Sequence, residues 1–195
     1  VTDGLDRGSI EAQNVSFDID GSGLAQRFAL QAEKMTAHAR RNGADLDLAT
    51  YVDSMRNDLF PGLTARAFAF EATLSEQSSL LEVPFIPLQG PFDAVLHRLA
   101  IEFDETSLLE LAGPVQIDAS NRVSGTLELT ISNLQEFTQL ASGFNPEIAG
   151  LFRQFGPVIA ALDTKPDDDA VTLPLTIRSN LISIGFIPLG QLPAF

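Results

Sequence analysis

The stretch Arg122–Ser132, "RVSGTLELTIS", decides the fold class of this chain. Apolar residues and one glycine stand at every second position from Val123 to Ile131, and Ser, Thr and Glu fill the positions between them. Because successive side chains of a strand point to opposite faces of a sheet, this period of two indicates a strand with one buried and one solvated face. A half-buried strand of this kind is typical of an antiparallel sheet.

The same alternation recurs on both sides of this stretch. It is found in "AVTLPLTIRS" at 170–179 and in earlier stretches at 9–20, 28–40, 64–74 and 94–105. Because the first two of these earlier stretches flank a Gly-Ser-Gly turn, they predict a hairpin. Pro174 has no amide hydrogen to donate, which favours an edge strand or a bulge. Together the patterns predict an α+β protein that is mostly antiparallel β, with a curved sheet of about eight strands.

Residues 133–162 interrupt the strand pattern with helical spacing. Asn133 can cap a helix, with Glu136 three positions on as its reciprocal partner. A second helix can start after Asn145, which precedes a proline suited to the first helical position. Pro157 removes a backbone hydrogen bond and should bend or break this second helix. We therefore expect a pair of short helices whose apolar faces pack on the sheet.

The stretch at 41–62 permits two interpretations. Apolar residues at helical spacing favour a helix from about Leu48 to Leu59, whereas "ADLDLATY" at 44–51 alternates like a strand. We favour the helix, with the strand followed by a loop as the alternative.

The charge balance and the missing residue types exclude several functions. The chain has 26 acidic and 12 basic side chains, and its formal charge of −14 repels nucleic-acid phosphates and anionic lipid headgroups alike. It has no cysteine, which excludes disulfides, thiolate nucleophiles and zinc sites that rely on sulfur. The absence of tryptophan and the single tyrosine argue against stacking sites for carbohydrate or single-stranded nucleic acid.

Length and hydropathy predict one soluble domain. A chain of 195 residues buries enough surface to fold as a single domain, residues 1–195, with a possible subdivision near 75–91. The chain has no run of about 18 apolar residues and does not open on a signal segment. Because it begins at Val1, we expect it to be the C-terminal part of a longer protein.

The two histidines are the residues best suited to proton transfer or metal binding. His97 lies within an apolar strand pattern, so we expect it in the core with a satisfied hydrogen bond. His38 forms a basic cluster with Arg40 and Arg41. We expect that cluster to be a solvated strand end, although it could hold an anionic headgroup or a carboxylate of a partner protein.

The remaining candidates for chemistry are weak. Asp167, Asp168 and Asp169 lack the alternate spacing of a calcium loop and predict a charged turn. Ser142 lacks the glycine spacing of a nucleophile elbow. We therefore predict that the protein is not an enzyme and uses no cofactor and no metal.

Phenylalanine is over-supplied, with 14 residues against one tyrosine. Phenylalanine adds apolar area without a polar group, so the chain builds either a large core or an apolar groove. The candidate lining of such a groove is Phe68, Phe70, Phe103, Phe152, Phe155, Phe186 and Ile187.

The end of the chain is uncharged. "GFIPLGQLP" at 185–193 partly repeats "VPFIPLQGP" at 83–91, which suggests a weak internal repeat. Because Pro188 and Pro193 cannot donate backbone hydrogen bonds, we expect this segment to lie against the core or an apolar cleft rather than to continue a sheet.

The C-terminal "TLPLTIRSNLISIGFIPLGQLPAF", from Thr172 onward, resembles the ending of an uncharacterised alphaproteobacterial family, domain of unknown function 2125. "SGTLELTISNLQEFTQL" also fits the strand and helix of that family, and the resemblance is strongest over 90–195. Where the family commonly has Asp-Gly in the turn, this chain has Ser179 and Asn180, which also suit a turn. The repeated strands are similar in architecture alone to AsmA-like envelope proteins.

The resemblance implies an envelope protein that faces the bacterial periplasm and is held at the membrane by an anchor outside this chain. Two functions follow as expectations. In the first, the Phe-rich sheet and the helices enclose a groove for a lipid or another apolar ligand. In the second, the same residues fill a solid core and the protein is a scaffold that binds an envelope partner. An unfilled apolar hollow would favour the first expectation.

Overall fold

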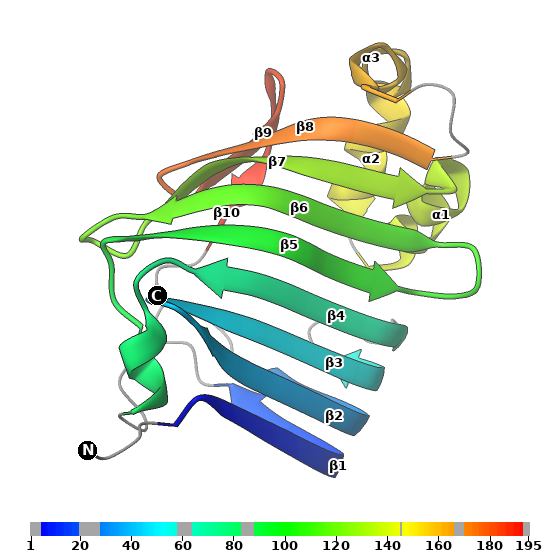
Figure 1. Ribbon diagram of the computed structural model, residues 1–195. Coiled ribbons are helices and arrows are strands. Elements are labelled where there is room, and N and C mark those ends of the chain that lie inside the picture. The colour runs from blue at the N-terminus through cyan, green and yellow to red at the C-terminus, as the bar shows by residue number, and fades with distance from the viewer. Residues whose placement is uncertain are drawn as a thin grey trace.

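In the described parts of the chain, ten strands form one antiparallel sheet, in which each strand pairs with the next strand of the chain (Figure 1). The computed structural model describes residues 5–19, 28–57, 64–82, 88–144, 146–165 and 170–192. The strands are β1 (Arg7–Ile19), β2 (Phe28–Asn42), β3 (Asp45–Asn57), β4 (Thr64–Leu74), β5 (Phe92–Glu102), β6 (Leu108–Ile117), β7 (Val123–Ser132), β8 (Ala170–Arg178), β9 (Leu181–Ile184) and β10 (Ile187–Gln191). This order confirms the predicted hairpin of β1 and β2 and the mostly antiparallel fold.

Helices occupy two connections of the sheet. The 3-10 helix η1 (Ser78–Leu81) lies between β4 and β5, and α1 (Leu134–Phe144), α2 (Pro146–Gln154) and α3 (Gly156–Leu162) lie between β7 and β8. In Figure 1 the three α-helices gather beside the end of the sheet formed by β7 and β8, far from β1. No helix in the described parts of the chain is long and apolar enough to cross a bilayer.

One face of the sheet is apolar over most of its width. The register places a row of six residues side by side from β3 to β8: Leu46, Leu74, Ala94, Val115, Gly125 and Ile177. We call the face that carries this row the apolar face and the opposite one the polar face. The alternation read from "RVSGTLELTIS" is confirmed, since Leu127, Leu129 and Ile131 are all buried.

The helices cover one end of the apolar face. Leu129, Ile131 and Leu173 of the sheet share one hydrophobic cluster with Phe137 and Phe152 of the helices, and we call this the helix cluster. Ile131 and Leu173 are fully buried. Burial of a large aliphatic side chain contributes roughly 1.5–3 kcal/mol, so this cluster anchors the helices to β7 and β8.

The short helix η1 covers a second part of the same face. Its residues Leu80 and Leu81 pack against Leu46, Leu74 and Ala94, and we call this the η1 cluster. The guanidinium of Arg41 on β2 donates to Glu82 Oε1 at 2.8 Å and to Ser78 Oγ at 3.3 Å. An apolar contact and an ionic contact therefore hold η1 in place.

The polar face is crossed by pairs of side chains on neighbouring strands. Arg40 donates to Asp47 at 2.6 Å, Tyr51 donates to Glu71 at 2.8 Å, and Lys34 lies 3.4 Å from Glu11. Such exposed pairs contribute little to stability, about 0–1 kcal/mol each. They keep this face solvated while the opposite face is packed.

The favoured helix at 48–59 is wrong, because strand β3 occupies residues 48–57 of that range. Residues 58 and 59 lie outside the described residues. The alternation of Leu46, Leu48 and Val52 directs these side chains to the apolar face, where Leu46 and Val52 are buried. A helix would have placed Tyr51 on the same side as Val52, but Tyr51 is 41% exposed and bonded to Glu71 on the polar face. Strand β3 is one reason why the sheet has ten strands rather than about eight.

The helix signals in 133–162 are confirmed where the structure describes them. Asn133 Oδ1 accepts from the Glu136 backbone N–H at 3.2 Å, and the Asn133 amide donates to the Glu136 carboxylate at 2.5 Å. Pro157 ends the predicted second helix, because α2 stops at Gln154 and α3 starts at Gly156. The cap at Asn145 lies outside the described residues. Three short helices therefore replace the predicted pair.

The two prolines of the last strands have different outcomes. Strand β9 pairs with β8 only over Leu175–Arg178. Pro174 therefore faces no strand on the β9 side of β8, which is the edge position that a missing amide hydrogen requires. The expectation that Pro188 prevents pairing is wrong, because β10 pairs with β9 and shifts register between Pro188 and Gly190. As the last strand of the sheet, β10 tolerates a missing donor on its outer side. Pro193 and part of 83–91 lie outside the described residues.

Candidate apolar groove

A hollow of about 480 Å³ opens on the apolar face between the helix cluster and the η1 cluster. We call it the apolar groove. It is lined by Phe70, Ala72 and Leu74 of β4, Phe92, Ala94, Leu96 and Leu99 of β5, Val115 and Ile117 of β6, Val123 and Leu127 of β7, Ile177 of β8, and Leu88 and Asn121 of the connections. Thirteen of these side chains are apolar and one, Asn121, is polar.

Small side chains contribute to the hollow. Ala72 lies between Leu48 and Leu96 on the neighbouring strands, and Ala94 lies between Leu74 and Val115. Because an alanine side chain ends at Cβ, these two positions leave space that a larger residue would fill. Both alanines therefore follow the apolar alternation of a buried strand face, but their side chains are too small to fill the space above the sheet.

The end of the groove at Ile117 and Val123 is formed by the turn between β6 and β7. Asp118 organises this turn, since its Oδ1 accepts from the backbone N–H groups of Ser120 at 2.8 Å and Arg122 at 3.0 Å. The Arg122 backbone bond is the main cause that lowers the pKa of Asp118 below its ordinary value of 3.8. The carboxylate is thus held in its charged form and fixes the position of Asn121 within the turn.

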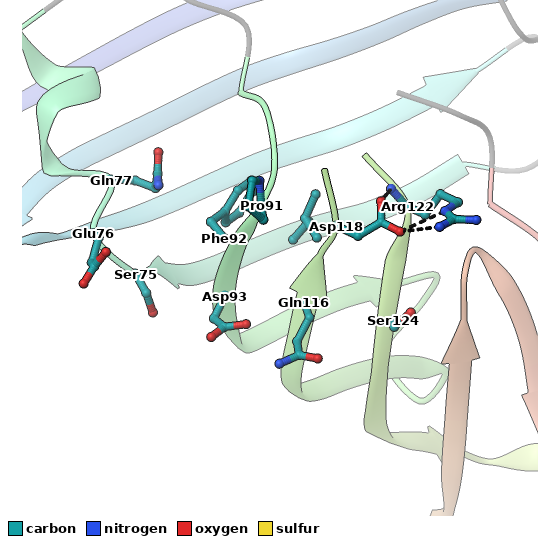
Figure 2. Close-up of a pocket in the computed structure, with 11 residues that line it drawn as sticks. Ser75, Glu76, Gln77, Pro91, Phe92, Asp93, Gln116, Asp118, Arg122 and Ser124 are labelled. Carbon is teal, nitrogen blue, oxygen red and sulfur yellow. Dashed lines mark hydrogen bonds and ion pairs between the residues drawn. The ribbon is translucent and has the colours of Figure 1, made fainter. Parts of the chain in front are cut away.

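A second hollow, of about 560 Å³, lies on the polar face at the same strand ends (Figure 2). Figure 2 shows the side chains of Ser75, Asp93 and Gln116 pointing to one side of the sheet, with Arg122 paired to Asp118 at 2.8 Å. Its lining carries three carboxylates and one arginine that is already paired. This excess of negative charge makes the hollow unsuited to an anionic ligand.

Both histidines lie on the polar face and line a third hollow. The prediction of His97 as a core residue is wrong, because its side chain is exposed; its predicted hydrogen bond is present, between Nε2 and Thr73 Oγ1 at 2.8 Å. The cause is a register shift between Leu96 and Leu99, which turns both leucines to the apolar face and His97 to the other.

His38 is an exposed residue of β2, and its Nδ1 lies 2.8 Å from Ser9 Oγ. This placement agrees with the solvated basic cluster predicted there, although Arg41 turns away to the apolar face and holds η1. Arg40 forms an ion pair with Asp47. Within the described residues no group of three or more histidine and acidic side chains could hold a metal ion. The acidic stretch 167–169 lies outside those residues.

The predicted lining residues fall into three places. Phe70 lines the groove, and Phe68 lies two residues before it on the same strand and face. Phe103 and Phe152 instead belong to the helix cluster, where both rings pack near Phe137, at centroid distances of 6.2 Å and 5.6 Å. These two phenylalanines therefore fill core and do not line the groove.

The three remaining predicted residues lie near the β9–β10 turn. Phe186 is 73% exposed at this turn, and its ring meets Phe155 edge to face at a centroid distance of 6.4 Å. Ile187 is buried and packs near Phe152. Of the seven predicted residues, one lines the groove.

The sequence prediction missed most of the groove because it chose residues by type, mainly phenylalanine, and not by the face of the sheet on which they lie. Leu96, Val115, Ile117 and Val123 are aliphatic residues of ordinary strands. The available signal was the pair of alanines at apolar-face positions of β4 and β5, next to larger residues on the same face. Asn121 gave no signal beyond that of a turn residue.

The fold and the groove define the protein as an open antiparallel sheet whose apolar face is partly covered by helices. A family model described as "Uncharacterized protein conserved in bacteria (DUF2125)" matches residues 2–193. The chain belongs to this bacterial family, which confirms the resemblance read from its C-terminal sequence. The comparisons with curated proteins and with solved structures gave no match.

Proposed function

We propose that this protein binds an acyl chain of a lipid in the apolar groove and is not an enzyme. The observation that carries the proposal is a hollow of about 480 Å³ lined by side chains of five strands, all but one of them apolar. This volume lies within the range of small-molecule sites, which are mostly apolar with a few polar groups. The groove is therefore better suited to a hydrocarbon chain than to a polar metabolite.

Packing energetics support an occupant. Ala94 belongs to the η1 cluster and Ala72 is buried, but both side chains end at Cβ and leave part of the hollow between the larger lining residues unfilled. Atoms that face a gap lose dispersion contacts, and a bound methylene chain would restore them. Each methylene removed from water contributes roughly 0.8 kcal/mol, so a chain of ordinary lipid length would bind with useful affinity.

The proposal includes a location at the periplasmic side of a bacterial envelope. The family is bacterial. The architectural likeness of the repeated strands to AsmA-like envelope proteins is the support for this side of the membrane. Lipids are the most abundant acyl-chain compounds of an envelope, so a protein at this location would meet the proposed ligand.

A second function, a scaffold that binds a protein partner, is favoured by one observation. Phe186 is 73% exposed and Leu181 of the same hairpin is 59% exposed. Exposed large apolar side chains at one edge of a sheet are a feature of protein interaction sites. In this function the groove would stay empty, and the β9–β10 hairpin would carry the interface.

The test is native mass spectrometry of the purified protein, followed by organic extraction and lipid analysis. Ile117 and Gln116 provide a matched pair, because Ile117 lines the groove and Gln116 is exposed on the polar face. Ile117→Glu and Gln116→Glu change the net charge equally. We expect a bound acyl species in the wild type and in Gln116→Glu, and its loss in Ile117→Glu.

Two results would contradict the proposal. A wild-type protein without any extractable lipid that also fails to take up added palmitate would favour the scaffold. Equal lipid content in the Ile117→Glu and Gln116→Glu proteins would place the lipid outside the groove.

A further inference from the structure

We infer that the groove takes an amphiphile in a fixed direction, with a carbonyl or carboxylate oxygen bound by the Asn121 side-chain amide and the hydrocarbon chain running toward Phe70 and Leu99. The inference rests on the proposed function and adds to it the class of headgroup and the residue that recognises it. It starts from one fact, that among the described residues that line the groove Asn121 alone is polar.

The orientation of the Asn121 amide follows from its hydrogen bond. Its side-chain oxygen accepts from the Gly90 backbone N–H at 2.8 Å, and a backbone donor can only be matched with an acceptor. The other side-chain atom is therefore the NH₂ group, which has two hydrogens to donate. No residue in the described ranges accepts a hydrogen bond from this nitrogen. Because Asn121 lines this end of the groove, we infer that its NH₂ group is the donor for a ligand oxygen.

The amide is held in place before any ligand binds. The Asn121 backbone N–H donates to the Asp118 carbonyl at 2.9 Å, and its φ of 57° lies in the left-handed region that asparagine tolerates. With backbone and side-chain oxygen both fixed, little rotamer freedom remains to be lost on binding. A preorganised donor of this kind favours ligands with an acceptor at one end.

The shape of the groove sets the direction of the chain. Asn121 follows Ile117 and precedes Val123, and the register aligns Phe92 with Ile117 and Ile117 with Val123 at this end. Phe70 and Leu99 face each other at the opposite end. From Phe92 to Leu99 the strand β5 advances by roughly 20 Å, enough for an extended hydrocarbon chain.

A free fatty acid and an acyl ester both present the required oxygen, and the neutral amide fits either. The carboxylate would gain a charge-assisted hydrogen bond, which is the stronger type. A comparison of palmitate with methyl palmitate therefore distinguishes the two sources, and hexadecane, which has the same kind of chain without an acceptor, reports on the chain alone.

The experiment measures displacement of Nile red, an uncharged apolar fluorophore, from the folded chain by these three ligands. Asn121→Asp keeps the oxygen that accepts from Gly90 but replaces the donor with a negative charge. We expect the affinity for palmitate to fall by at least about tenfold, that for methyl palmitate to fall several-fold, and that for hexadecane to stay unchanged. Asn14→Asp is the control, because Asn14 is an exposed residue of β1 with a similar φ of 53° and does not line the groove.

The outcomes separate this inference from the proposal beneath it. Failure of all three ligands to displace Nile red from the wild type would overturn the proposed function and this inference together. Hexadecane binding as tightly as both acceptor ligands, or equal affinities in the Asn121→Asp and wild-type proteins, would overturn this inference alone. If Asn121→Asp does not fold, Asn121→Gly, which suits a positive φ, removes the donor and is expected to give the same selective loss.

Discussion

Gly125 of β7 is a residue of the sheet that leaves no room for a side chain. A Cβ at this position would lie 2.5 Å from the Pro114 carbonyl oxygen, a distance that requires the backbone of β6 to shift. We expect Gly125→Ala to lower the free energy of unfolding by roughly 1–3 kcal/mol. The measurement is urea unfolding followed by circular dichroism.

Gly150 of α2 is the matched control, since a Cβ there would meet no atom within 4 Å. Alanine is the better helix former, so Gly150→Ala should raise the free energy of unfolding by about 0.5–1 kcal/mol. A Gly125→Ala protein as stable as the wild type would show that β6 and β7 are less closely apposed than the structure has them.

Asp47 of β3 makes the polar face sensitive to acid. The hydrogen bond from Arg40 is the main cause that lowers the pKa of Asp47 below 3.8, and the bonds from Thr73 and Asn42 act in the same direction. Because the folded-state pKa is lowered, the stabilisation is present above the ordinary value and is lost as the pH falls below it. We expect the free energy of unfolding to fall less between about pH 6 and pH 3 in Asp47→Asn than in the wild type.

The check on this prediction is urea unfolding at both pH values. Asp53→Asn on the same strand makes the same change in net charge and serves as the control. An equal fall in the Asp47→Asn and wild-type proteins would mean that the bonds to Asp47 do not stabilise the folded chain.

At the scale of elements, α1 depends on its cap. Asn133 accepts from the Glu136 backbone N–H and adopts a φ of 51°, so both its side chain and its backbone conformation are used. Asn133→Ala should lower the free energy of unfolding by about 1 kcal/mol, through the lost cap and the strained φ. Asn133→Gly loses the same bond but tolerates the φ, and should cost only a few tenths of a kcal/mol. Thermal melting of both variants checks the order, and a glycine variant less stable than the alanine variant would contradict it.

A helix or strand could be predicted from sequence where its apolar residues fit one periodicity only. Strand β7 alternates without interruption, and its pattern gave both its type and its buried face. Strand β3 was missed because Leu48, Val52 and Met55 also fit a helical period, and only pairing with β2 and β4 decides between them. Tertiary pairing of this kind is not encoded in a single segment.

The candidate site was less predictable than the strands. On β5 the register shift between Leu96 and Leu99 exchanges the faces of the residues around it, so strict alternation wrongly put His97 on the same face as Leu99. A bulge inserts one extra residue into a strand, so the side chains after it change faces. The composition of the segment does not reveal this insertion. The space left by Ala72 and Ala94 also depends on the register, which pairs Ala72 with Leu96 and Ala94 with Leu74 on the neighbouring strand.

At the scale of the whole molecule, the groove couples ligand binding to stability. A ligand that binds only the folded chain stabilises it by roughly 2.7 kcal/mol when its free concentration is about 100 times the dissociation constant. We therefore expect palmitate to raise the melting temperature of the wild type. Ala94→Leu places a larger side chain in the floor of the groove, so the rise should be much smaller in this variant. The measurement is thermal melting with and without palmitate.

Val95→Leu is the matched control, because Val95 is the next residue of β5, is 43% exposed and lies on the polar face. This variant should keep the full rise in melting temperature. Without ligand, Ala94→Leu should melt near the wild type, since the hollow provides the space that the added atoms need. An equal rise with palmitate in Ala94→Leu and the wild type would locate the binding of palmitate away from the groove, because the same hollow cannot hold both the leucine side chain and the hydrocarbon chain.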